Sequence, residues 1–171
     1  MDRTHDETAE AKARLWDKLE DSRTGMLWVA DAHQHPQPMT HFADPEAESL
    51  WFITSSDTDL VAAIGHGAEA RFTVQSPGDG FHASLTGSLV SYDSAEKLDE
   101  LWSFAAAAWF EKGRDDPKVT LLRFSPREAS VWMSEGNPVV VGVKMMRAAM
   151  SEGESHPDVG EHHVLYLNLA A

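Results

Sequence analysis

The stretch "PQPMT" (residues 36–40) lies between two runs that are typical of β-strands, "GMLWVAD" (25–31) and "SLWFITS" (49–55). Its two prolines are one residue apart, and a proline has no N–H to donate to a sheet ladder. Such a segment is usually an edge, a bulge, or a strand whose free side faces something other than another strand. We therefore expect this stretch to have one side open.

Strand patterns continue on both sides of this stretch. Aromatic and β-branched residues predict strands at 24–31, 37–42, 49–54, 70–75, 81–92, 119–125 and 129–134, and a terminal strand at 162–169. Helical spacing of apolar residues predicts a helix at 6–21 and a long one after Tyr92. Asp57 or Thr58 can cap a short helix that runs to Ile64, and a further helix is expected at 139–150. The long helix carries Trp102 and Trp109, whose expected role is packing in the core or in a dimer.

These elements predict an α+β protein. Antiparallel strands with one short helix among them and helices at the ends favour a small closed or half-closed barrel of about six strands. No linker divides the 171 residues, so we expect a single domain over 1–171, with a C-terminal helix and strand at about 139–169. Its predicted core is Leu27, Val29, Trp51, Ile53, Phe72, Leu85 and Leu122.

Composition excludes several classes of function. The net charge is -14 and the basic residues are scattered singly, which argues against a nucleic-acid-binding protein. No apolar run approaches the roughly 20 residues that span a bilayer, and no secretory signal is visible. The chain has 0 cysteines, which removes disulfides and thiolate sites. We expect a cytoplasmic protein with no membrane partner.

The order of motifs resembles the pyridoxamine 5'-phosphate oxidase-like family of FMN-binding split barrels, in its general stress protein branch. The resemblance covers about residues 15–167 and includes "GMLWVAD", "QPMT", "LWFITS", "GSLV" and "GEHHVLYL". Its most specific part is "LWSFAAAAWFEKGRDDPKVTLLRFSPREASVW" (101–132). The resemblance implies a split β-barrel with flanking helices.

The resemblance also implies a homodimer with two flavin sites, each built from both subunits. FMN is the expected cofactor, with FAD or no flavin as alternatives. In such proteins the strand that corresponds to 37–40 lies against the flavin ring, and the segments 52–55 and 58–60 follow the ribityl chain and the phosphate. The implied contacts are Gln37, Pro38, Met39, Thr40, Phe52, Ile53, Thr54, Ser55, Thr58 and Leu60. Trp109 would close the site from the partner subunit, and no catalytic side chain is implied.

Two expected cations are missing from this set. Members commonly carry Arg where this chain has Gln37, and Lys where it has Leu60. Two lost charge-assisted contacts would weaken a phosphate-bearing flavin by about two to four powers of ten. Arg71 is a candidate replacement if its side chain points to the site.

The turn before the short helix has mixed electrostatics. The hydroxyls of Ser55, Ser56 and Thr58 remain as phosphate donors. Asp57 and Asp59 occupy the same turn, where they would repel a phosphate dianion.

Other kinds of site have less support. His33, His35 and His41 are close in sequence, as are His162 and His163, but an imidazole metal site needs three or four converging ligands. We expect no metal. A serine nucleophile has no Gly-x-Ser-x-Gly elbow to support it.

Two functions remain open. The first is a flavin-binding protein. As an FMN-dependent oxidoreductase, it would pass a hydride or electrons between the flavin and a small partner. The second is a split-barrel dimer without flavin that has a binding or structural role, in which Gln37 and Leu60 have replaced the phosphate-binding cations.

Overall fold

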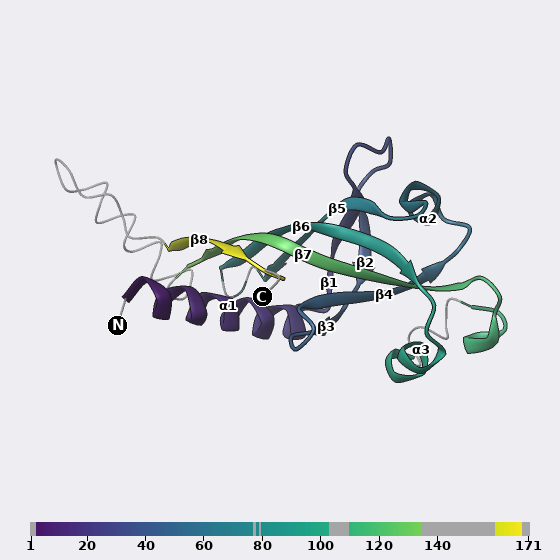
Figure 1. Cartoon of the computed structure of the whole chain (residues 1–171), viewed down its shortest axis with the longest axis horizontal. Helices are drawn as coiled ribbons and strands as arrows, with labels where there is room; N and C mark the ends of the chain where they lie inside the picture. The colour runs from purple at the N-terminus through teal and green to yellow at the C-terminus, as the bar shows by residue number, and fades with distance from the viewer. Residues whose placement is uncertain (1–2, 77, 79, 103–109, 135–159, 169–171) are drawn as a thin grey trace.

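The computed structural model describes the chain except for residues 1–2, 77, 79, 103–109, 135–159 and 169–171. Its helices are α1 (Arg3–Ser22), α2 (Asp59–Ile64) and α3 (Ala95–Leu101), with a 3₁₀ turn, η2, at Gly113–Asp115. Its strands are β1 (Thr24–Val29), β2 (Gln37–Thr40), β3 (Phe42–Asp44), β4 (Ser49–Ser55), β5 (Ala68–Ser76), β6 (Phe81–Tyr92), β7 (Val119–Met133) and β8 (Glu161–Tyr166). The protein is of the predicted α+β class (Figure 1). Trp109 and the helix predicted at 139–150 lie outside the described residues.

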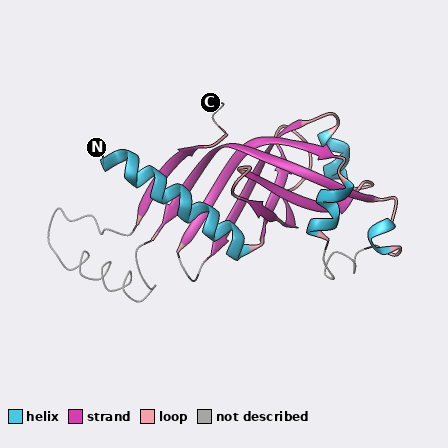
Figure 2. Ribbon diagram, turned by 60° about the horizontal axis from the view of Figure 1, so that its bottom comes forward, coloured by secondary structure: helices cyan, strands magenta, loops and turns pink. Residues whose placement is uncertain are grey.

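One antiparallel sheet of eight strands forms the body of the protein. The order along it is β2-β1-β5-β6-β7-β4-β3, and β8 pairs with β7 off this path. Only His41 separates β2 from β3, so both ends of the path belong to one piece of chain. This piece pairs with β1 at its start and with β4 at its end, which curls the sheet into a barrel (Figure 2).

The barrel stays open along β2, the strand that contains "QPMT". In the part of the chain that the structure describes, β2 pairs with β1 and approaches β4 without forming a ladder with it. A proline is tolerated in such a strand because one side has no ladder to complete. The predicted strand with one open side is confirmed, and the barrel is split between β2 and β4.

Apolar rows across the strands fill the barrel. Leu27, Phe72 and Leu85 lie opposite one another on β1, β5 and β6, and all three are fully buried. Fully burying such a side chain contributes about 1.5–3 kcal/mol. The predicted core residues that belong to this cluster are Leu27, Val29, Phe72, Leu85 and Leu122.

The prediction that Trp51 and Ile53 lie in this core is wrong. Leu50 and Phe52 of β4 are the residues that point inward and belong to the core cluster. Ile53 is only half-buried. Trp51 is buried as well, but outside this cluster, on the outer face of β4, where it packs against Tyr92 and Lys97.

Helix α1 runs along one side of the curled sheet (Figure 1). It buries Leu15, Trp16 and Leu19, which the helical spacing predicts. His41, at the corner between β2 and β3, donates a hydrogen bond of 2.6 Å from Nε2 to the Leu19 carbonyl. Its ring also packs edge-on against Phe72, with 5.0 Å between the ring centroids. This corner of the barrel is thereby fixed to α1.

Both short helices lie at the opposite end of the barrel from the N-terminus (Figure 1). Thr58 caps α2, since its Oγ1 accepts a hydrogen bond of 3.3 Å from Val61 N. Ser94 caps α3 in the same way, with Lys97 N as the donor at 3.1 Å. Among the described residues, no helix is long and apolar enough to cross a membrane.

Candidate functional site

The split of the barrel brings together two predicted segments that are separate in sequence. Residues 37–40 form β2, residues 52–55 form the end of β4, and the two strands approach each other. Thr58 follows at the start of α2, beside the end of β4. The predicted site therefore maps to one region of the barrel, apart from Trp109, which lies outside the described residues.

Side chains of β2 alternate between the two faces of the barrel wall. Gln37 lies opposite Leu27 and shares its inner face, and Met39 packs against the core on that face. Pro38 and Thr40 are exposed on the outer face. Successive side chains of a strand point to opposite faces, so a ligand on one face cannot contact all four.

The end of β4 shows the same division. Phe52 is fully buried in the core, whereas Ile53 and Ser55 are half-buried on the outer face. Leu60 of α2 is also fully buried and belongs to the core cluster. Phe52 and Leu60 can reach a ligand outside the core only through their backbone.

A charged contact organises the turn between β4 and α2. The Ser55 hydroxyl donates a hydrogen bond of 2.5 Å to Asp57 Oδ1, and Lys118 Nζ lies 2.6 Å from Asp57 Oδ2. The hydrogen bonds from Lys118 and Ser55 hold the pKa of Asp57 below its ordinary value, and Asp57 in turn raises the pKa of Lys118. Sequence reasoning missed Lys118 because it is 61 residues from Asp57, and only the pairing of β4 with β7 brings them together.

The replacement cation suggested by the sequence lies elsewhere. Arg71 is exposed on β5, opposite Trp28 of β1 and Thr86 of β6. Along the sheet, β5 is separated from β4 by β6 and β7. The structure therefore does not bring the strand of Arg71 beside β4.

A groove of about 430 Å³ lies on the outer face of β1, β5, β6 and β7. Its polar lining is Thr24, Thr73, Gln75, His82 and Ser84. Met26 and Trp132 add apolar surface, and no Asp, Glu, Lys or Arg is among the described lining residues. Thr24 and Met26 lie opposite Thr40 and Pro38, so the groove adjoins the outer face of β2.

Trp132 gives this groove an aromatic wall. Its side chain is 46% exposed, and the ring of His162 stacks on it with 4.8 Å between centroids. His162 Nε2 lies 2.7 Å from the Ser130 hydroxyl, which fixes the imidazole in place. The sequence shows the motif that ends in Trp132, but it does not show that the side chain of Trp132 is exposed.

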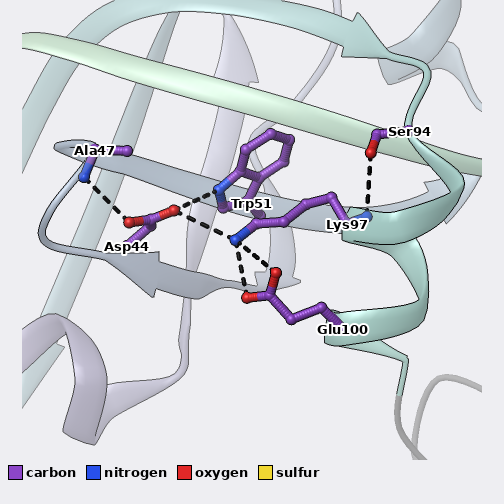
Figure 3. A network of polar contacts seen from close by, with 6 residues as sticks. All are labelled: Asp44, Ala47, Trp51, Ser94, Lys97 and Glu100. Atoms are coloured by element: carbon purple, nitrogen blue, oxygen red, sulfur yellow. Dashed lines mark hydrogen bonds and ion pairs between the residues drawn. The ribbon is translucent and has the colours of Figure 1, made fainter.

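A second polar cluster surrounds Trp51 (Figure 3). Its Nε1 donates to Asp44 Oδ2 at 3.4 Å, and the Lys97 ammonium lies 5.3 Å from the centroid of the ring. Lys97 also forms ion pairs with Asp44 at 3.3 Å and with Glu100 at 2.9 Å. Because these charges are already paired, we assign the cluster a packing role: it fixes α3 on the outer face of β4.

The histidines do not form a metal centre in the described part of the chain, where no group of three or more His, Cys, Asp or Glu could hold an ion. His163 Nε2 contacts Glu161 at 3.1 Å.

Comparisons with known proteins agree with the fold. The family model described as "Pyridoxamine 5'-phosphate oxidase like" matches residues 10–158. A protein of Jannaschia sp. CCS1 assigned to general stress protein 26 is 34% identical, with a TM-score of 0.78 over 94% of this chain and 99% of that one. The general stress FMN/FAD binding protein of Xanthomonas citri is 30% identical, with a TM-score of 0.69 over 87% of this chain and 98% of that one. The comparison with curated proteins finds no match. The chain belongs to the pyridoxamine 5'-phosphate oxidase-like family.

Proposed function

We propose that this protein binds a flavin, with FMN as the first candidate and FAD as the second, at the split between β2 and β4. The observation that carries the proposal is the convergence of β2 with the end of β4 and the 55–58 turn, at an edge where the described strands form no ladder. The related protein of Xanthomonas citri is named as binding FMN or FAD, which supports the same class of ligand.

The chemistry of the residues fits such a group. A flavin needs a flat, neutral surface for its ring and charged or hydroxyl donors for its phosphate. Strand β2 offers the ring a wall without charged side chains, namely Gln37, Pro38, Met39 and Thr40, while Ser55 and Lys118 are donors at the turn. The amide oxygen and nitrogen of Gln34, in the loop that leads into β2, are buried with no hydrogen-bond partner in the described structure. They are a donor and an acceptor available to a ligand.

In this proposal the protein works as a homodimer, and Trp109 of the partner subunit closes the site. A bound flavin would supply the redox chemistry, by accepting or releasing a hydride or electrons. The chain's own part is to hold the ring along β2 and the phosphate near Ser55 and Lys118. An oxidoreductase role then requires a small electron donor or acceptor that reaches the ring.

A titration tests the proposal. Flavin-free protein is mixed with FMN, FAD and riboflavin, and binding is followed by quenching of flavin fluorescence. We expect saturation at one flavin per chain. Thr40→Arg, which adds bulk to the outer face of β2, should weaken binding by at least about tenfold. Ala13→Arg, at an exposed position of α1, is the matched control and should bind like the wild type.

A flavin-free dimer with a binding or structural role is the second candidate. It is favoured by the Asp57 carboxylate at the turn and by the uncharged Gln37 and Leu60. Failure of all three flavins to saturate the wild-type protein would select this function over the first.

A further inference from the structure

The Asp57 carboxylate accepts two donors of the kind that a phosphate group would use. Its Oδ1 accepts from the Ser55 hydroxyl at 2.5 Å, and its Oδ2 lies 2.6 Å from the Lys118 ammonium. Hydroxyl and ammonium groups are common partners of phosphate oxygens. The carboxylate therefore competes for these donors with any phosphate that enters the turn.

The turn does not need Asp57 for its shape. Ser56 N donates to the Lys118 carbonyl at 2.8 Å, which ties the end of β4 to the residue before β7 through the backbone. The cap of α2 is Thr58 rather than Asp57. Because the backbone and Thr58 already fix the shape of this region, Ser55 and Lys118 can exchange the Asp57 carboxylate for another anion without loss of the turn.

The ion pair between Asp57 and Lys118 can also be replaced by another anion at low energetic cost. The side chains of Lys118 and Asp57 are 60% and 57% exposed, and ion pairs this exposed contribute little to stability. Lysine presents its charge on a flexible stem and can turn to a new anion without backbone movement. The hydrogen bonds from Lys118 and Ser55 keep the pKa of Asp57 low, so the carboxylate is charged at neutral pH.

We propose that Asp57 is an internal substitute for the flavin phosphate: its carboxylate occupies Ser55 and Lys118 until a phosphate displaces it. Because the phosphate must compete with this carboxylate, Asp57 limits the preference of this protein for FMN over riboflavin. This inference rests on the proposed function, in which the turn takes the phosphate end of the flavin. Lys118 then replaces the cations absent at Gln37 and Leu60, and Asp57 offsets part of its effect.

The test compares Asp57→Asn with the wild type in titrations with FMN and with riboflavin, which has the ring but no phosphate. The substitution keeps the size of the side chain, removes its charge and releases Lys118. We expect FMN to bind about five- to tenfold more tightly, because the substitution frees Lys118 and also removes the repulsion between the carboxylate and the phosphate. Riboflavin affinity should stay within about threefold. Adding Lys118→Met to Asp57→Asn should abolish the gain for FMN.

Asp59→Asn is the matched control, because it removes the same charge from the first position of α2. It should improve FMN affinity by less than about threefold, since in the described residues Ser55 and Lys118 contact the carboxylate of Asp57 and not that of Asp59. Thermal unfolding of each variant shows whether it is folded.

Three results would overturn the inference while leaving flavin binding intact. They are unchanged FMN affinity in Asp57→Asn, an equal gain for riboflavin, and an equal gain from Asp59→Asn. If neither flavin binds to the wild type or to any variant, both the proposed function and this inference fail.

Discussion

His41 is fully buried, with only 1% of its surface exposed. Its Nε2 donates to the Leu19 carbonyl, while its Nδ1 is buried without a partner in the described structure. Burial, together with the nearby charge of Arg23, lowers the pKa of His41. The folded protein therefore keeps this ring neutral, because a second proton would be held without a partner in the barrel wall.

This histidine predicts how stability depends on pH. The unfolded chain protonates His41 below about pH 6.5, whereas the folded chain resists it, so the unfolded state binds more protons as the pH falls. The free energy of unfolding should decrease below about pH 6.5, by at most about 1.4 kcal/mol per pH unit from this residue. Urea unfolding between about pH 5 and 7.5 measures the slope.

The matched variants are His41→Gln, which keeps an amide donor for Leu19, and His66→Gln at an exposed position. The first should flatten the slope and the second should leave it unchanged. Equal slopes in His41→Gln and the wild type would show that the ring does not resist protonation.

Strand β4 shows what a strand pattern leaves undecided. Leu50, Trp51, Phe52 and Ile53 are all apolar, so the alternation that normally separates a buried face from an exposed one is missing. Trp51 is buried on the outer face because α3 and its Lys97 cover it. The two residues are far apart in the sequence, so no local pattern encodes this contact.

Substitutions on β4 check this assignment of faces. Phe52→Ala should lower the free energy of unfolding by about 3–5 kcal/mol, because it leaves a cavity in the core. Ile53→Ala removes a half-buried side chain and should cost about 1–2 kcal/mol. Chemical denaturation of the two variants gives both values. A larger loss for Ile53→Ala than for Phe52→Ala would contradict the observed orientation.

Local patterns predicted most of the described elements but not the arrangement of the site. Proline spacing predicted the open side of β2, and the spacing of Leu15, Trp16 and Leu19 predicted the buried side of α1. The inner and outer faces of β2 and β4, and the pairing of Lys118 with Asp57, depend on register between distant strands. Such register follows from packing of the whole barrel, so sequence alone did not reveal which cation lies at the turn.

At the scale of the whole barrel, four of the five large apolar side chains that are exposed in the described residues gather on one face, while the fifth, Tyr92, lies beside Trp51 at the far end of β6. Met26, Trp132, Val164 and Tyr166 are 38%, 46%, 46% and 61% exposed. They share the outer face of the sheet, because their neighbours in the strands, such as Leu27, Val131 and Leu165, point into the core. An apolar surface of this kind, next to the edge strand β8, is typical of a face that another protein covers.

We therefore predict that a second copy of this chain covers that face. The double substitution Val164→Lys and Tyr166→Lys places two charges on β8 and should shift the protein from dimer to monomer, because a stable interface buries about 800 Å² per partner and excludes unpaired charge. Sedimentation velocity at micromolar concentration measures the change, and Ala13→Lys on the exposed side of α1 should remain dimeric. A wild-type protein that sediments as a stable monomer would rule out the dimer, and with it a site closed by Trp109 of the partner subunit. A wild-type dimer that survives the double substitution would instead place the interface on a different face from Val164 and Tyr166.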